Sequence, residues 1–138
     1  LLWCTGLKAV EVTAQMDNPE WDLRTALTLR LDNAALAPLS MRADSNIFDK
    51  RQLSLYYGAA GTAAFRGFPF EVTLERPGGA PVRLGEKELP APPSPVGNFI
   101  DCILDRGRPE LDGSTAVHIV EILQAAYESA RTGHKVRL

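Results

Sequence analysis

The sequence predicts an α+β fold, with a largely antiparallel open β-sheet and two helices packed on one of its faces. Two observations support this prediction. Apolar and polar residues alternate with a period of two in residues 8–16 and 22–33, which is typical of strands, whereas a helical period takes over after residue 94. Strands that follow one another directly along a chain favour antiparallel pairing, and the two late helices would cover one side of the sheet.

The first expected strands show this alternation most clearly. Residues 8–16, "KAVEVTAQM", alternate apolar residues with glutamate, threonine and glutamine. Residues 22–33, "DLRTALTLRLDN", alternate leucines with arginines and threonine. The pair Asp32-Asn33 favours a tight turn into "AALAPLSM" (34–41), which makes a hairpin. Because Pro38 cannot donate to a strand ladder, we expect the third strand to lie at an edge or to be irregular.

Further short strands and a proline-rich connector are expected next. The strand segments are "QLSLYYG", "TAAFRG", "FPFEVTLERPGG" and "PVRLG". The turn "GAAG" (58–61) has a glycine at each end, which permits positive φ there. The segment "ELPAPPSP" (88–95) contains four prolines, so it is expected to be a stiff and extended connector.

The first expected helix begins directly after this connector. Ser94 is a good N-cap, and Pro95 suits the first turn of a helix. The helix is expected to end at Gly107. Its apolar stripe consists of Phe99, Cys102 and Ile103.

The second expected helix covers residues 114–132, with Asp112 or Ser114 as its N-cap and Gly133 at its end. Apolar residues recur along it at helical spacing and on more than one side, which indicates a helix with extensive burial. These residues are Val117, Ile119, Val120, Ile122, Leu123, Ala126, Tyr127 and Ala130. The last five residues, 134–138, alternate again, so we expect them to form a strand-like stub that pairs with the sheet.

Composition excludes several classes of protein. A chain of 138 residues with 45% hydrophobic and 23% charged residues is typical of a soluble globular domain. The net charge is −2 and no basic stripe is present, so we expect no nucleic-acid partner. No apolar run is long enough to span a membrane. Cys4 and Cys102 lack metal-ligand spacing and are expected to be free thiols in a reducing cytoplasm.

Motifs that carry catalysis are absent from the sequence. It has no glycine fingerprint for a dinucleotide, no P-loop, no HExxH and no GxSxG. We therefore expect no catalytic, cofactor-binding or metal-ligating residue in this chain. His118, within the second helix, is expected to be packed or half-exposed, and His134, beyond its end, to lie at the surface.

Residues 42–51, "RADSNIFDKR", are the segment best suited to binding a ligand. They gather cationic, acidic and amide side chains between two strands, and such a set can hydrogen-bond a sugar or polyol. Composition alone supports an ordinary charged surface loop equally well.

Several segments, in their order along the chain, resemble the C-terminal domain of the Gfo/Idh/MocA family of oxidoreductases. The stretch "PVGNFIDCILDRGRPELDGSTAVHIVEILQAAYESARTGHKVRL" is similar to the end of that family, with its "NFIDCI" helix, its "GRP" loop and a long helix that closes in "AAYESARTG". Upstream, "VEVTAQMDN", "ALTLRLDNAALAPLS" and "LYYGAAGTAAF" resemble successive strands of its sheet. The ordered set covers nearly the whole chain, and this order makes the resemblance specific.

The resemblance implies an activity for a longer protein. Full-length relatives have an N-terminal Rossmann domain that binds NAD or NADP, a Glu-Lys-Pro segment with a catalytic lysine, and an Asp/His motif on a helix that would end in "LLWCTG". None of these motifs is in residues 1–138. The chain is therefore expected to be a single, partial C-terminal domain for substrate binding and oligomerisation, which is inactive by itself.

The resemblance also implies partners and site residues. The expected substrate is a sugar, an inositol or a related polyol, and the expected substrate contacts are Arg42, Asn46, Asp49 and Arg51. The chain is expected to be a cytoplasmic homo-oligomer that associates through the sheet face opposite the helices. The alternative function is a non-enzymatic ligand-binding or assembly module that uses the same sheet.

Overall fold

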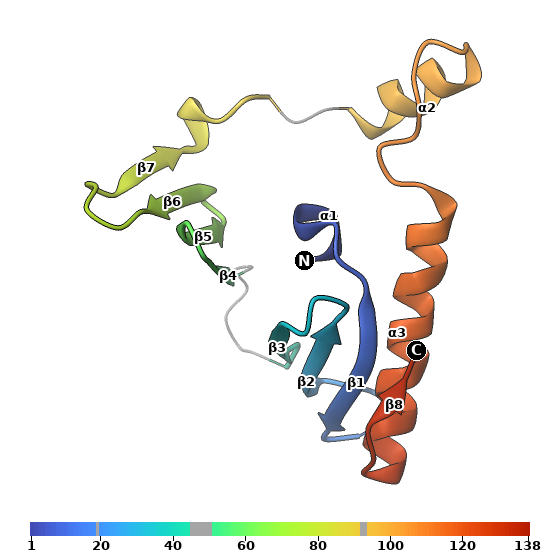
Figure 1. Ribbon diagram of the computed structural model, residues 1–138. Helices are drawn as coiled ribbons and strands as arrows, with labels where there is room; N and C mark the ends of the chain where they lie inside the picture. The colour runs from blue at the N-terminus through green and yellow to red at the C-terminus, as the bar shows by residue number, and fades with distance from the viewer. Residues whose placement is uncertain (19, 45–50, 92–93) are drawn as a thin grey trace. The chain divides into compact units, whose positions relative to one another are not determined.

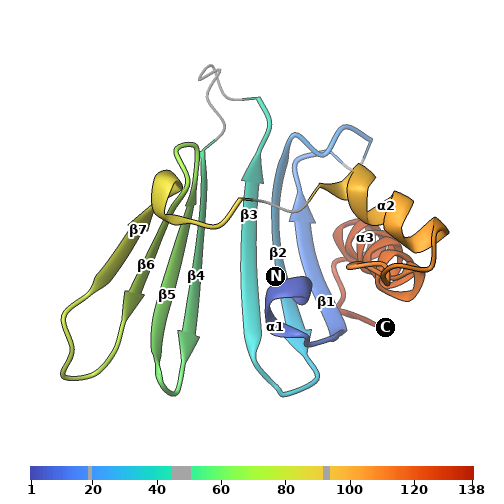
Figure 2. The same ribbon diagram turned by 90° about the horizontal axis from the view of Figure 1, so that it is seen from above.

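The computed structural model describes residues 1–18, 20–44, 51–91 and 94–138. They fall into two compact units: unit 1 consists of Leu1–Ser45 and Asn98–Leu138, and unit 2 of Asn46–Gly97. Figure 1 and Figure 2 show the elements of both units. That residues 1–138 form one partial domain stays a prediction.

The elements follow the predicted order of strands, connector, helices and terminal strand. Unit 1 contains α1 (Leu2–Thr5), β1 (Ala9–Met16), β2 (Arg24–Leu31), β3 (Leu36–Arg42), α3 (Gly113–Thr132) and β8 (Val136–Arg137). Unit 2 contains β4 (Gln52–Gly58), β5 (Gly61–Gly67), β6 (Glu71–Glu75), β7 (Val82–Gly85) and the short 3-10 helix η1 (Glu86–Glu88). The helix α2 (Pro95–Ile103) begins at the end of unit 2 and continues into unit 1.

The sheet of unit 1 is antiparallel throughout, in the order β3-β2-β1-β8. Its register opposes Val12 to Leu29, and Leu29 to Ala37, so the strand alternation places apolar residues of the three long strands on one face. α3 packs on this face along β1, as Figure 2 shows. Ile122 and Ala126 of α3 are buried there together with Val12 and Leu29, and they form the core of unit 1.

The terminal strand β8 pairs with β1, as the alternation at the end of the sequence predicted. Val136 lies opposite Val12, and the amide of Leu138 donates to the carbonyl oxygen of Val10 over 3.1 Å. β8 has only two residues, whereas β1 has eight. Most of this side of β1 therefore needs other hydrogen-bond partners.

Two side chains of α3 supply such partners. The amide of Ala14, two residues beyond the last pair with β8, donates to Ser129 Oγ over 2.9 Å. The amide of Ala9, at the start of β1, donates to His118 Nε2 over 3.2 Å. Both alanines and Ser129 are buried, so no water replaces these bonds. Packing of α3 thus completes the hydrogen bonding of β1 as well as its hydrophobic contacts.

Local signals define where the helices begin and end. Ser94 Oγ accepts from the Gly97 amide over 3.1 Å at the start of α2, as predicted. Asp112, one of the two predicted N-caps of α3, accepts from the Thr115 amide over 2.8 Å. Gly133 has a φ of 72° and ends α3 in the left-handed conformation that favours glycine.

The sheet of unit 2 is also antiparallel, in the order β4-β5-β6-β7. One of its faces is apolar: Tyr56 and Phe65 make an edge-to-face contact there, with ring centroids 5.3 Å apart. Val72 and Leu84 are opposed on the same face. No described residue of unit 2 is buried.

The predicted α+β class and the open antiparallel arrangement are confirmed, and Pro38 does lie on the edge strand β3. The structure refines the prediction in two respects. The strands form two four-stranded sheets. Of the two long helices, α3 packs on β1, whereas α2 ends at Ile103, before the expected Gly107, and none of its residues is buried.

The Ser129 bond to β1 gives a first testable prediction. Ser129→Ala should lower the free energy of unfolding by about 1–3 kcal/mol, because it leaves the buried Ala14 amide without an acceptor. The loss is expected although alanine is the better helix former. Urea unfolding followed by circular dichroism measures it, with Gln124→Ala on an exposed position of α3 as the control. Equal stability of the two variants would contradict the role of Ser129.

Candidate functional site

The loop predicted to bind substrate, residues 42–51, is described only at its ends. Arg42 is the last residue of β3, and Arg51 directly precedes β4. Asn46 and Asp49 lie outside the described residues. Arg42 belongs to unit 1 and Arg51 to unit 2, so each residue is described within its own unit.

Arg42 is part of a cluster of three charged side chains. The hairpin register places Arg42 directly opposite Arg24 of β2. Asp44 accepts from Arg42 Nε through Oδ1 over 2.8 Å and from Arg24 Nε through Oδ2 over 2.9 Å. A second nitrogen of Arg24, Nη2, also contacts Oδ2, so this guanidinium binds the carboxylate with two nitrogens.

The electrostatic effect of this cluster falls on Asp44. Hydrogen bonds from Arg24, which has the larger effect, and from Arg42 lower the pKa of Asp44 to about 2, because both favour the ionised carboxylate. The Asp44 side chain is 21% exposed, while the two arginines are 59% and 65% exposed. The carboxylate therefore holds both guanidinium groups near the start of the loop and leaves much of each open to a ligand.

The part played by Arg24 was not predicted. Asp32-Asn33 was expected to be the turn between the second and third strands, and counting outward from these two residues pairs residue 24 with residue 41. The structure pairs Arg24 with Arg42, because the turn is one residue longer and the Leu31 amide donates to the Ala35 carbonyl oxygen. The acceptor for this arginine pair, Asp44, lies only two residues beyond the end of the ladder.

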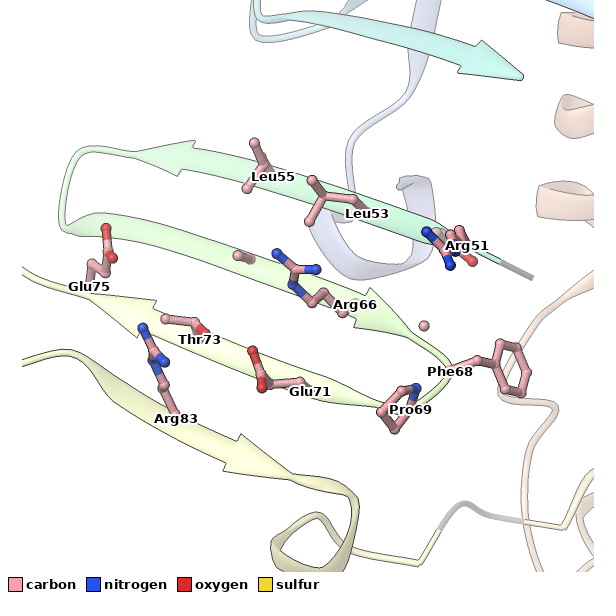
Figure 3. A pocket seen from close by; sticks show the side chains of 13 residues that line it. Arg51, Leu53, Leu55, Arg66, Phe68, Pro69, Glu71, Thr73, Glu75 and Arg83 are labelled. Atoms are coloured by element: carbon pink, nitrogen blue, oxygen red, sulfur yellow. The ribbon is translucent and has the colours of Figure 1, made fainter. Parts of the chain in front are cut away.

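Arg51 lies at the edge of a hollow of about 780 Å³ over one face of the unit 2 sheet. Figure 3 shows the side chains of this face, which come from β4, β5, β6 and β7. We call it the charged face. It consists of Leu53, Leu55, Ala64, Arg66, Glu71, Thr73, Glu75 and Arg83.

The charged face places hydrogen-bond donors beside acceptors. Arg66 is the direct cross-strand neighbour of Glu71, and Thr73 is that of Arg83. Within the described residues, no ion pair shorter than 4.0 Å joins Arg66, Glu71 and Arg83 to one another. Their polar groups are thus available to a polyhydroxylated ligand or to a polar protein surface.

The histidine of α3 has a partner at each ring nitrogen. His118 Nε2 accepts from the Ala9 amide, so its ring proton is on Nδ1, which faces Glu121 Oε2 at 3.2 Å. Both nitrogens are therefore engaged within unit 1. Among the described residues, no three histidine, cysteine or acidic side chains are grouped as metal ligands would be. No helix in the described part of the chain is long and apolar enough to cross a membrane.

Comparisons of sequence find no matching protein-family model and no curated relative. Comparisons of structure do find similar proteins. A candidate oxidoreductase from Thermotoga maritima matches 99% of this chain with a TM-score of 0.85 and 19% identity, over 43% of its own length. The aldose-aldose oxidoreductase of Caulobacter crescentus, complexed with glycerol, matches 99% of this chain with a TM-score of 0.80 and 18% identity, also over 43% of its length.

A third similar structure is the WlbA dehydrogenase of Bordetella pertussis, in complex with NADH and UDP-GlcNAcA. It matches 100% of this chain with a TM-score of 0.62 and 20% identity, over 41% of its own length. The chain thus spans less than half the length of these proteins. At these identities the likeness establishes the fold alone. The similar structures are Gfo/Idh/MocA-type oxidoreductases, the type that the sequence resembles.

The charged cluster around Asp44 predicts a dependence of stability on pH. Its folded pKa of about 2 is lower than the value of about 3.9 in an unfolded chain. A lowered carboxyl pKa stabilises the fold above pH 4, and this stabilisation is lost as the pH falls from about 4 to about 2. Asp44→Asn should therefore lower the urea midpoint at pH 7, and its difference from the wild type should shrink toward pH 2. Glu20→Gln, at an exposed position, is the control. A difference that does not change with pH would contradict this account.

Proposed function

We propose that this chain, with the fold of the C-terminal part of the Gfo/Idh/MocA oxidoreductases, is the substrate-binding and oligomerisation part of an NAD(P)-dependent oxidoreductase. The observation that carries this proposal is the extent of the structural match. Two longer oxidoreductases each match 99% of this chain, over 43% of their own length. The proposed substrate is a sugar, an inositol or a related polyol, and the proposed location is the cytoplasm.

The sequence supports separate roles for this chain, which would contact the substrate, and for a Rossmann domain, which would bind the cofactor. NAD or NADP would be bound by a Rossmann domain of the full-length protein, because no dinucleotide fingerprint occurs in residues 1–138. The cofactor supplies the hydride acceptor or donor, and the chain described here supplies a wall for the substrate. Two of the similar proteins support these assignments, since one is complexed with glycerol and another with NADH and a nucleotide sugar.

We propose Arg42, Asn46, Asp49 and Arg51 as the substrate contacts. Recognition of a polyol needs several donors and acceptors in defined positions, and this loop offers both. The Asp44 carboxylate supports the proposal, because it orients Arg42 through a 2.8 Å hydrogen bond while most of the guanidinium stays exposed. Arg24, held by the same carboxylate, would position Arg42.

We also propose that the chain associates with itself through sheet faces that carry no helix. In unit 1, the face opposite α3 presents Thr13, Gln15, Thr28 and Ser40 around a shallow hollow of about 400 Å³. Thr13, Thr28 and Ser40 are small, so they leave room for a second sheet at the usual spacing of about 10 Å. The alternative, a non-enzymatic module, uses the same faces. The full-length gene product decides between the two: an upstream glycine fingerprint and a Glu-Lys-Pro segment would favour the enzyme, and their absence would favour the module.

Binding of the cofactor gives a direct test. The 138-residue chain should not bind NADH or NADPH measurably in calorimetric titrations, because it offers no glycine-rich turn before a helix N-terminus for the pyrophosphate. The full-length gene product should bind one of the two. Saturable micromolar binding by the 138-residue chain would contradict the proposed division of labour.

Substitutions in the loop test the substrate contacts. Alanine at Arg42, Asn46, Asp49 or Arg51 of the full-length enzyme should lower kcat/KM by roughly two- to tenfold each, since losing one hydrogen bond costs about 0.5–1.5 kcal/mol. Cofactor affinity should stay unchanged. Arg76→Ala, at an exposed position of unit 2, is the matched control. If all four variants keep the wild-type kcat/KM, the loop is an ordinary surface segment.

A further inference from the structure

The β2–β3 hairpin carries one arginine more than its own stability requires. Arg24 and Arg42 are directly opposed at the end of the strand ladder, and like charges at opposed positions of two strands repel each other. A single arginine would be enough to pair with Asp44. The second arginine adds a repulsion that the hairpin alone does not explain, so a role in binding an anion has to be considered.

Asp44 holds both guanidinium groups by the same edge. A guanidinium can bind an anion through Nε and a terminal nitrogen, or through its two terminal nitrogens. Asp44 contacts Nε and Nη2 of Arg24, and it contacts Nε of Arg42. Within the described residues, no acceptor other than Asp44 is found for the terminal nitrogens of either arginine. The outer edge of each guanidinium is therefore left for a second anion.

The neighbouring acid does not take this position. Asp17 contributes to the electrostatic field that raises the pKa of Arg24, after the larger effect of Asp44. Its Oδ1, however, accepts from the backbone amides of Asn18 and Arg24, over 2.9 Å and 3.1 Å. Arg24 and Arg42 stay mostly exposed although Asp44 holds them in place. Because the two cations are already oriented, they lose little conformational freedom when they bind a ligand.

The chemistry of the outer edges selects an anion with at least two oxygens. Carboxylate and phosphate oxygens match the spacing of the terminal nitrogens of arginine, whereas a hydroxyl group offers a single uncharged oxygen. We propose that the substrate is an anionic polyol whose carboxylate or phosphate group binds between Arg24 and Arg42. This inference rests on the proposed function and narrows its substrate to a sugar acid or a sugar phosphate. It also makes Arg24 a substrate contact, in addition to its role in positioning Arg42.

Binding to the full-length gene product tests the charge of the substrate. The probes are D-glucose and D-galactose, each compared with its uronate and its 6-phosphate, so the members of a set differ only in the group at the last carbon. In calorimetric titrations, at least one anionic probe should bind about tenfold or more tightly than its neutral counterpart, because hydrogen bonds to charged groups are the stronger ones. Preference for a uronate identifies a carboxylate, and preference for a 6-phosphate identifies a phosphate.

Substitution of Arg24 tests the place where the anion binds. Arg24→Gln should lower the affinity for the preferred anionic probe about tenfold or more and change the affinity for the neutral sugar by less than about twofold. A purely structural role of Arg24 would lower both affinities together. Arg30→Gln is the matched control and should keep both affinities. Arg30 is also an arginine of β2 beside a carboxylate, Glu11 at 3.6 Å, but it lies at the other end of the ladder.

The outcomes separate this inference from the proposed function. A wild type that binds the neutral sugars as tightly as the anionic ones, or that binds none of the probes, would overturn the inference. Equal losses of anionic and neutral affinity in Arg24→Gln would do the same. Titration of the same protein with NADH and NADPH tests the enzymatic function by itself. A protein that binds a cofactor but shows no preference for anionic sugars keeps the proposed function and loses this inference alone.

Discussion

The hydrogen bonding of β1 is the constraint on which unit 1 depends. β1 is central to the core, yet its neighbour on one side, β8, covers only two residues. Without an acceptor, each of the buried amides of Ala9 and Ala14 would lower the stability of the fold by about 1–3 kcal/mol. α3 supplies both acceptors, His118 and Ser129, from the face that also buries Ile122 and Ala126. Register, helix orientation and core packing are therefore linked, because a rotation of α3 would break all of them together.

The two units differ in how their sheets are covered, and this difference bears on function. In unit 1 the alternation of β1 and β2 meets an amphipathic helix, so one face is buried within the chain. In unit 2 the alternation separates an apolar face from a charged face, and neither is buried among the described residues. Large apolar side chains of unit 2 are consequently exposed, among them Leu53 at 57% and Val82 at 51%.

The charged residues Arg24, Arg42 and Asp44 lie where the β2–β3 hairpin meets the proposed substrate loop. The β2–β3 register brings two arginines side by side, which would repel each other without an anion between them. Asp44 provides that anion, and the same interaction lowers its pKa and orients Arg42. The turn between β2 and β3, in which the Leu31 amide donates to the Ala35 carbonyl oxygen, thus sets the strand register that places Arg24 opposite Arg42. Such transfer of local geometry to a site is possible because a strand ladder is rigid.

Local features of the sequence determined most of the element order. The alternation in 8–16 and 22–33, the cap at Ser94 and the glycine at 133 predicted strands and helix ends that the structure confirms, because these signals act between residues close in the chain. The resemblance of ordered motifs predicted the fold that the structural comparisons show. Of the predicted substrate contacts, Arg42 and Arg51 can be placed, while Asn46 and Asp49 lie outside the described residues.

Only the tertiary structure decided how distant segments meet. The bonds from α3 to Ala9 and Ala14 join residues 109 and 115 positions apart, and neither His118 nor Ser129 stands out in the helical pattern. The division of the strands into two sheets, and the absence of buried residues in α2, likewise do not follow from periodicity. Periodicity shows which side of an element is apolar, but the partner of that side depends on packing between segments far apart in the chain. That packing is a property of the whole fold, and no short stretch of sequence contains it.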